Sequence, residues 1–233
     1  MAIAFGTAVN GGRGVSPYTS SSSITVNAGD VLVVGIWRGG ASTGDTMTGV
    51  TWDGGSQAMT QAKKLVNGTE GDIYIYFLQN PTAATSTVSA TASESGVNIY
   101  ILMATYSGVK TSAQPSATSS AAAAATTVTD TITTVDDNSW TVLMGGNVSG
   151  TPAAGTGLVR RIQGDFSESA LFDSNGAVTP AGGYGQTWTG TTLLGDVSMA
   201  LSPPGSATAS RIMFPSKMSG MGVGGVLGGN RSE

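Results

Sequence analysis

The 233-residue chain has a composition that excludes many kinds of enzyme. It contains no Cys and no His, so disulfides, thiol nucleophiles, Cys-based metal sites and Ser-His-Asp or Cys-His catalysis are all excluded. The formal net charge is -4, and the ten Lys and Arg residues are scattered, which argues against nucleic-acid binding. We therefore expect a folded, non-enzymatic protein that carries no cofactor and no metal.

The N-terminal stretch MAIAFGTAVNGG lacks the basic region and the long apolar core of a secretory signal. No stretch approaches the roughly 18 apolar residues that a membrane helix needs. These features predict a protein that is made in a cytoplasm and has no membrane partner.

Alternation of apolar and polar residues, which is typical of β-strands, is the dominant pattern along the chain. The first clear pair of strands is Ile24 to Val26 and Val31 to Trp37, separated by the turn-forming residues Asn27-Ala28-Gly29-Asp30. Because the second run is almost entirely apolar, it predicts a strand that is covered on both faces.

The stretch VTWDGGSQAMTQ, residues 50 to 61, contains two alternating runs around Gly54-Gly55, which predicts a hairpin. The stretch DIYIYFLQNP follows, with one aliphatic face and one face rich in tyrosine. The alanine run in SATSSAAAAATTV is too short for an autonomous helix, so we predict a loop leading into a strand, with a short helix as the alternative.

The later segments TTVTDTITTV, DDNSWTVLMGGNV, GTGLVRRIQG, SESALFDSNGAV, YGQTWTG and LLGDVSMALSP continue the strand pattern. Their spacing is close to the roughly 8–12 residues expected of an all-β sandwich or barrel, and they bring the total to about a dozen strands. We therefore predict a single antiparallel β-sandwich over residues 1–201, followed by an extended arm over residues 202–233.

The four tryptophans divide into two pairs. Trp37 and Trp140 lie in strongly apolar runs and are expected in the core. Trp52 and Trp188 are flanked by Thr and Gly, so each is either a core residue or an exposed platform for a sugar ring. We keep Trp52 and Trp188 as candidate contacts to a host surface glycan.

The densest group of carboxylates is formed by Asp130, Asp136 and Asp137. The sequence Asp136-Asp137-Asn138 has the composition of a turn, and ligands for Ca²⁺ or a glycosidase acid–base pair are the alternatives. The adjacent basic pairs Lys63-Lys64 and Arg160-Arg161 are expected to guard strand edges, with one member exposed and the other turned inward or paired with a carboxylate.

Pro203-Pro204-Gly205 ends the last predicted strand, and the C-terminal arm mixes glycine with large apolar residues. A free arm of this composition would be poorly solvated, so we expect it to dock on a neighbouring subunit. Its candidate assembly contacts are Met213, Phe214, Met218 and Met221.

Several segments, including AGDVLVVGIW, VTWDGGSQAMTQ and ATYSGV, occur in an order that resembles a group of uncharacterised proteins encoded in tailed-phage genomes. Related β-sandwich modules occur in bacterial surface proteins. The resemblance covers approximately residues 1 to 201, and its motifs are turn and strand signatures without catalytic residues. It implies a jelly-roll or concanavalin-like sandwich that forms part of a virion.

The leading functional expectation is therefore a phage virion structural protein, most simply a capsid decoration or head-fibre protein. Its expected partners are other copies of itself, with a trimer as the working guess, and virion proteins such as the major capsid protein. A receptor- or carbohydrate-binding module of a tail fibre is the alternative.

Overall fold

The computed structural model describes residues 1–39, 46–66, 71–146, 150–165, 168–191 and 194–205, and the fold below refers to these residues. They form nineteen β-strands and no α-helix. Accordingly, no helix in the described part of the chain is long and apolar enough to cross a membrane. The expectation of an all-β, antiparallel protein is confirmed.

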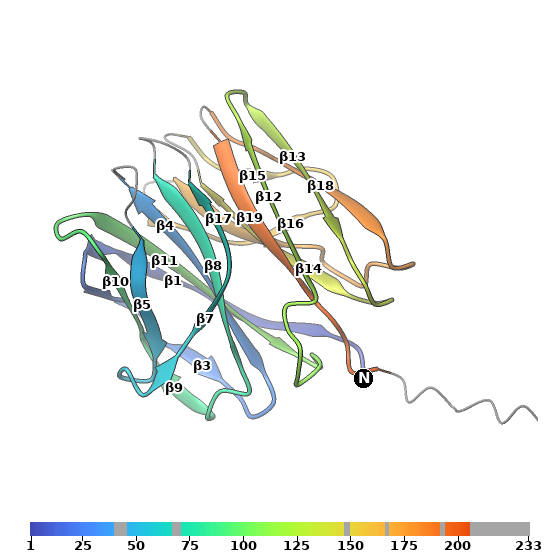
Figure 1. Ribbon diagram of the computed structural model, residues 1–233, viewed down its shortest axis with the longest axis horizontal. Helices are drawn as coiled ribbons and strands as arrows, with labels where there is room; N and C mark the ends of the chain where they lie inside the picture. The colour runs from blue at the N-terminus through green and yellow to red at the C-terminus, as the bar shows by residue number, and fades with distance from the viewer. Residues whose placement is uncertain (40–45, 67–70, 147–149, 166–167, 192–193, 206–233) are drawn as a thin grey trace, which may run out of the picture.

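The strands form layers that lie side by side in Figure 1. The first half of the chain builds an inner N-sheet of five strands, in the order β1 (Ala4–Val15), β11 (Asn98–Ser107), β4 (Val31–Gly39), β8 (Asp72–Gln79) and β7 (Thr60–Val66). An outer N-layer covers one face of it with two small sheets: β2 (Tyr18–Thr19), β10 (Val88–Ala92), β5 (Met47–Trp52) and β6 (Gln57–Ala58), and separately β3 (Ile24–Val26) and β9 (Ala84–Ser86).

The second half of the chain repeats this construction. Its inner C-sheet has the order β12 (Ala117–Ala123), β19 (Leu194–Leu201), β14 (Trp140–Gly146), β17 (Ser169–Asp173) and β16 (Val159–Gln163). Its outer C-sheet has the order β13 (Thr127–Thr133), β18 (Gly183–Thr189) and β15 (Ala153–Ala154). None of these sheets closes into a barrel.

Three apolar cores lie between the four layers. The first fills the space between the outer N-layer and the inner N-sheet, and the second lies between the two inner sheets. The third is smaller and lies between the inner C-sheet and the outer C-sheet. Because each inner sheet has a core on both faces, β4 is buried along nearly its whole length, as its apolar sequence predicts.

The two halves have equivalent strand orders and pack on each other as the subunits of a two-fold dimer would. In the inner sheets β1 corresponds to β12, β11 to β19, β4 to β14, β8 to β17 and β7 to β16. Across the interface β1 contacts β16, and the equivalent pair, β12 and β7, makes the same contact from the other half. The central strands β4 and β14, which are equivalent to each other, also touch, as expected at a two-fold axis. The two inner sheets approach each other closely at Gly35, where an added Cβ atom would lie 2.5 Å from Met144 Sδ. The predicted single sandwich is thus two stacked sandwiches.

The predicted turns are present. At residues 27–30, the Asn27 amide donates to Asp30 Oδ2 at 2.9 Å and Gly29 has a φ of 83°. At the VTWDGG hairpin, the Ser56 amide donates to the Asp53 carbonyl at 3.1 Å between β5 and β6. Left-handed backbone at Asp53 and the two following glycines allows the chain to reverse there.

The alanine run differs from its prediction, because its first residues belong to a regular strand. β12 pairs with β19 from Ala117 to Ala123, and this pairing outweighs the helix propensity of alanine. The following turn at residues 136–138 is as predicted, since the Ser139 hydroxyl donates to the Asp136 carbonyl at 2.7 Å and Asn138 has a φ of 63°.

Candidate functional site

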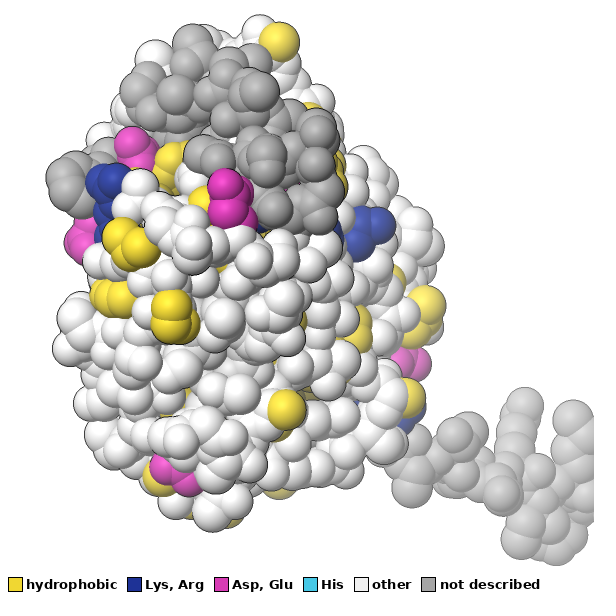
Figure 2. All heavy atoms as spheres, turned by 60° about the vertical axis from the view of Figure 1, so that its left-hand side comes forward, with side chains coloured by type: hydrophobic (Ala, Val, Ile, Leu, Met, Phe, Trp, Pro, Cys, Tyr) yellow, Lys and Arg dark blue, Asp and Glu magenta, His cyan; other side chains and the backbone are white. Residues whose placement is uncertain are grey.

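The outer N-layer presents a surface of hydroxyl side chains, which we call the N-face. Its residues alternate with core residues along short strands, and Figure 2 shows this side of the molecule with few charged groups. Hydroxyls pair across strands, with 2.8 Å between Thr19 Oγ1 and Ser89 Oγ and 2.7 Å between Thr25 Oγ1 and Thr85 Oγ1. The N-face comprises Thr19, Thr25, Thr51, Thr85, Ser89 and Thr91.

The outer C-sheet presents a matching surface at the other end of the stack, which we call the C-face. Strand β13 alternates strictly, with exposed threonines between buried core residues. Threonine suits a pleated, half-solvated sheet because its branched side chain packs against its neighbours. The C-face comprises Thr127, Thr129, Thr131, Thr133, Thr187 and Thr189.

The edges of the inner sheets differ in how they are protected from pairing with other chains. β1, β7 and β16 each contain a register shift, and β7 and β16 also carry the predicted basic pairs. Bulges and charges of this kind discourage edge-to-edge association. β12 has the sequence ATSSAAA and a regular register, so it is the least protected of these four edges.

Two hollows lie at the end of the molecule where Met1 and two of the last described residues, Pro203 and Pro204, are found. One has a volume of about 430 Å³ and is lined in part by Met1, Trp140 and Pro204. The other has a volume of about 320 Å³ and shares Met1 and Pro204 with the first. The chain leaves the folded body beside these hollows, and the arm contacts Met213, Phe214, Met218 and Met221 lie outside the described residues.

All four tryptophans are buried. Trp37 and Trp140 lie in the core between the inner sheets, as predicted. Trp52 and Trp188 are both 0% exposed, the first in the core of the N-terminal half and the second in that of the C-terminal half. A glycan cannot reach either indole in this structure. The Thr and Gly residues that flank these two tryptophans reflect the alternation of buried and exposed positions along a strand. They do not indicate that the indoles themselves are exposed.

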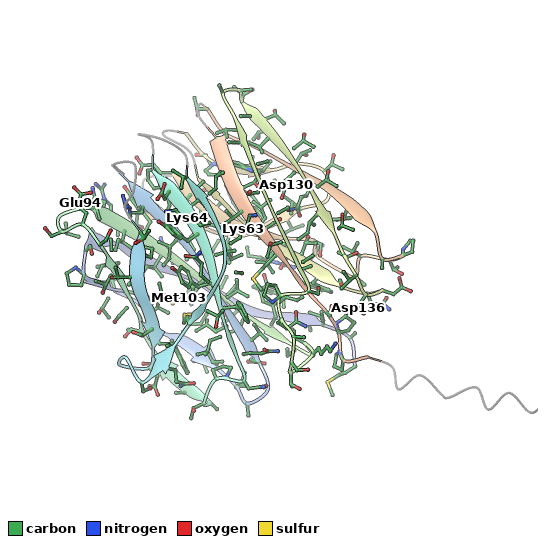
Figure 3. The ribbon with its side chains drawn as sticks, viewed as in Figure 1. Lys63, Lys64, Glu94, Met103, Asp130 and Asp136 are labelled. Carbon is green, nitrogen blue, oxygen red and sulfur yellow. The ribbon has the colours of Figure 1, made fainter. Side chains whose placement is uncertain are left out.

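The basic pairs behave as predicted, since one member of each contacts a buried carboxylate. Lys64 Nζ lies 3.1 Å from Asp72 Oδ2, and Arg161 Nε lies 2.7 Å from Asp173 Oδ2. Figure 3 shows Lys63 and Lys64 together on β7 at the edge of the inner N-sheet.

The Asp173 carboxylate also connects the two halves of the molecule. The Tyr106 hydroxyl, which belongs to the inner N-sheet, donates to Asp173 Oδ2 at 3.1 Å. The Arg161 guanidinium packs over the Phe5 ring at 4.2 Å, which adds a second contact between the halves. Burial, reinforced by the Asp173 carboxylate, raises the pKa of Tyr106 well above its ordinary value, so its hydroxyl keeps its proton.

A buried polar cluster lies between the inner and outer sheets of the C-terminal half. Asp130 Oδ2 contacts Ser119 Oγ at 2.5 Å, Ser198 Oγ at 2.8 Å and Gln186 Nε2 at 3.2 Å. The two serine oxygens are themselves 2.5 Å apart. A second carboxylate, Asp196, accepts hydrogen bonds from Trp188 Nε1 at 2.8 Å and from the Ala121 amide at 3.2 Å.

The electrostatics of this cluster favour the neutral form of Asp196. Burial is the main cause, and repulsion by Asp130 adds to it, so the pKa of Asp196 rises to about 7. The hydrogen bonds from Trp188 and Ala121 oppose this shift without cancelling it. No described Lys or Arg forms an ion pair with Asp130 or Asp196.

The cluster was only partly visible in the sequence. The sequence places Asp130 near Asp136 and Asp137, but Figure 3 shows Asp130 well apart from Asp136, whose segment forms the turn described above. Nothing in the sequence pattern distinguishes Asp196. In the described part of the chain no three His, Cys, Asp or Glu side chains lie together as a metal-binding group.

Comparison with protein-family models, with curated proteins and with solved structures found no match in any of the three.

Proposed function

We propose that this chain is a non-enzymatic structural protein that acts by associating with copies of itself and with other proteins of a particle. The observation that carries the proposal is the pair of uncharged hydroxyl surfaces at opposite ends of the layered body. Such faces cost little to desolvate compared with charged ones, and they suit packing against another uncharged surface.

Two further features support self-association. The edge strand β12 has neither bulge, charge nor proline, and a strand of this type can pair with a strand of another chain. The sequence after Gly205 contains large apolar residues, and the hollow beside Pro203 and Pro204 has apolar walls from Met1, Ile3 and Trp140.

The placement in a tailed-phage virion, as a capsid decoration or head-fibre protein, rests on the sequence resemblance. The jelly-roll assignment belongs to the same proposal. Each half packs a five-stranded antiparallel sheet on a smaller one, which is the layered architecture from which a jelly roll is built. The alternative function, binding of a host glycan by a tail-fibre module, has no candidate contacts left, because Trp52 and Trp188 are both buried.

Light scattering coupled to size-exclusion chromatography tests the proposal directly. The wild-type chain should elute as an oligomer, and Thr129→Lys with Thr131→Lys on the C-face should shift it toward smaller species. Ser95→Lys, which adds charge at an exposed loop position, should not. A wild-type chain that stays monomeric at high concentration would contradict self-association, and its absence from purified particles would contradict the virion assignment.

A further inference from the structure

We propose that the free edge of β12 binds an extended strand from the C-terminal arm of a neighbouring copy, namely residues 206–214. This inference rests on the proposed function, self-association, and names the two segments that meet. Among the described strands, β12 pairs only with β19, so its other side has no strand partner. Every residue of β12 is at least partly exposed, whereas every residue of β19 is buried. An added strand can therefore reach this edge.

The equivalent strand of the N-terminal half, β1, shows how the same architecture can close an edge. β1 has two register shifts against β11, and it carries Arg13. β12 instead pairs with β19 at all seven of its positions without a shift, and it contains no charged residue and no proline. Because bulges, charges and prolines are the devices that blunt exposed edges, an edge that lacks all three is suited to pairing.

A second copy of the whole folded body would fit this edge poorly. β7 lies against β12 on the same side of the molecule, and it carries Lys63 in addition to the Lys64 that contacts Asp72. Two β12 strands paired around a two-fold axis would bring the two β7 edges toward each other, and like charges placed together oppose association. A single extended strand brings no neighbouring layer with it, so it avoids this repulsion.

The arm contains one stretch whose sequence suits a strand. Residues 206–214 read SATASRIMF and contain neither glycine nor proline, whereas the sequence after Pro215 is rich in glycine, which is depleted in strands. The pentapeptide SATAS also occurs at residues 89–93, where its first four residues belong to β10. The stretch is slightly longer than β12, so it can cover the whole edge.

The exit of the chain favours a neighbouring copy over the same molecule. Pro203 and Pro204 line a hollow with Trp140 and Ala177, on the side of β19 that faces β14. The free edge of β12 lies on the opposite side of β19. A return to it would cross roughly 10–15 Å at about 4.8 Å per strand, which would use about three or four residues of the segment. A neighbour that packs beside the exit can receive the segment from its first residue.

The absence of cysteine from the chain permits a direct cross-linking test. Ser120 is the central residue of β12 and Ser210 is the central residue of the donated segment, so the two positions lie close together for either strand direction. Full-length Ser120→Cys mixed with full-length Ser210→Cys and a short bismaleimide should give a covalent heterodimer, with the linked peptides identified by mass spectrometry. Ser95→Cys, at an exposed loop position, is the matched control and should give no such product with Ser210→Cys.

Proline substitutions test whether backbone pairing makes the contact. Thr208→Pro combined with Ile212→Pro removes two amide donors from the donated segment, and proline is poorly tolerated within a sheet. In full-length Ser210→Cys, this pair of substitutions should abolish the cross-link to Ser120→Cys. In the wild-type background it should shift the oligomer toward smaller species in light scattering. Val223→Pro, in the glycine-rich part of the arm, is the control and should change neither result.

The results distinguish this inference from the proposed function. An oligomeric wild-type chain without a cross-link between positions 120 and 210 would overturn strand donation and leave self-association standing. A predominant Ser120→Cys homodimer would show that β12 pairs with its own copy instead. An intramolecular link in the Ser120→Cys/Ser210→Cys double variant would show that the arm returns to its own body. Either result, or equal cross-linking of Ser95→Cys, contradicts the inference, and a strictly monomeric wild type contradicts both proposals.

Discussion

The Tyr106 hydroxyl donates a hydrogen bond to Asp173 across the interface between the two halves, and both side chains are 0% exposed. Arg161 completes the arrangement from the edge strand β16, so a cation, a carboxylate and a phenol from both halves meet in one buried place. The interface is therefore fixed in register by a polar link as well as by apolar packing.

Replacing Arg161 should destabilise the protein strongly. Arg161→Met leaves the Asp173 carboxylate buried without its countercharge, and breaking one side of such a pair costs about 3–5 kcal/mol. The free energy of unfolding from urea denaturation measures the effect. Arg160→Met, at the exposed neighbouring position, is the comparison: it removes a hydrogen bond to the Pro152 carbonyl but leaves no buried charge without its partner, so it should cost far less. Equal effects of the two substitutions would show that the link contributes nothing.

Tyr106→Phe removes only the hydroxyl and should have a smaller effect. A hydrogen bond to a charged group contributes about 1.5–3 kcal/mol, so the loss should lie near the lower end because Arg161 and the Asn175 amide still contact Asp173. Combining the substitution with Arg161→Met in a double-mutant cycle should give a non-additive result. Strict additivity would mean that the two residues do not act through the same carboxylate.

The free energy of unfolding should fall as the pH rises because of Asp196. Its pKa is raised from an ordinary value near 3.8 to about 7, so the folded state binds the proton more tightly than the unfolded state. The resulting stabilisation is complete below about pH 4 and is lost as the pH rises through about 7, with a slope of at most about 1.4 kcal/mol per unit. The difference between wild type and Asp196→Asn, measured by urea denaturation from pH 4 to pH 8, isolates this contribution. A pH-independent difference would contradict it.

The tryptophan fluorescence of the native protein should be that of four buried indole side chains. Trp37 and Trp140 are 7% and 9% exposed and the other two are 0% exposed, so the native spectrum should be shifted to the blue. Iodide should quench it far less than it quenches the urea-unfolded chain. Added glycans should leave the spectrum unchanged. Strong quenching of the native protein would show that an indole is accessible and would revive the sugar-platform interpretation.

Removing the arm should leave the folding of the rest of the chain unchanged and weaken its assembly into oligomers. The chain should be ended after Gly205 rather than after Leu201, because the Lys110 amide donates to the Ser202 carbonyl at 2.8 Å and the Ser202 amide donates to Gln114 Oε1 at 3.2 Å. This shortened protein should unfold at the temperature of the full chain but form smaller oligomers in light scattering. Unchanged oligomers would mean that Met213, Phe214, Met218 and Met221 are not assembly contacts.

The local features of the fold could be predicted from the sequence because they depend on neighbouring residues. The turn at residues 27–30 follows from its own Asn, Gly and Asp, and the burial of β4 follows from its uninterrupted apolar run. The layer order depends on non-local pairing, which periodicity does not reveal. Asp196 illustrates the limit: it alternates with Val197, a pattern typical of a strand with one solvated face, yet the outer C-sheet covers that face.

The equivalence of the two halves has a short counterpart in the sequence. Residues 24–35 read ITVNAGDVLVVG, and residues 132–146 read ITTVDDNSWTVLMGG. Each begins with Ile-Thr, passes through a turn that contains Asp, and continues as an apolar strand with glycine near its end. In the structure these are β3 to β4 and the end of β13 to β14, which occupy equivalent places in the two halves.

The presence of two unlike outer faces in one chain also limits the polymers that it can form. In a dimer of identical subunits the two outer faces would be the same, but here the N-face and the C-face have different sequences and belong to one covalent unit. If only one kind of face pairs with its like, a two-membered complex closes at once. Pairing of the N-face of one molecule with the C-face of the next leaves a fresh face at each end, so growth is directional and continues until a rotation closes a ring or another protein caps the chain.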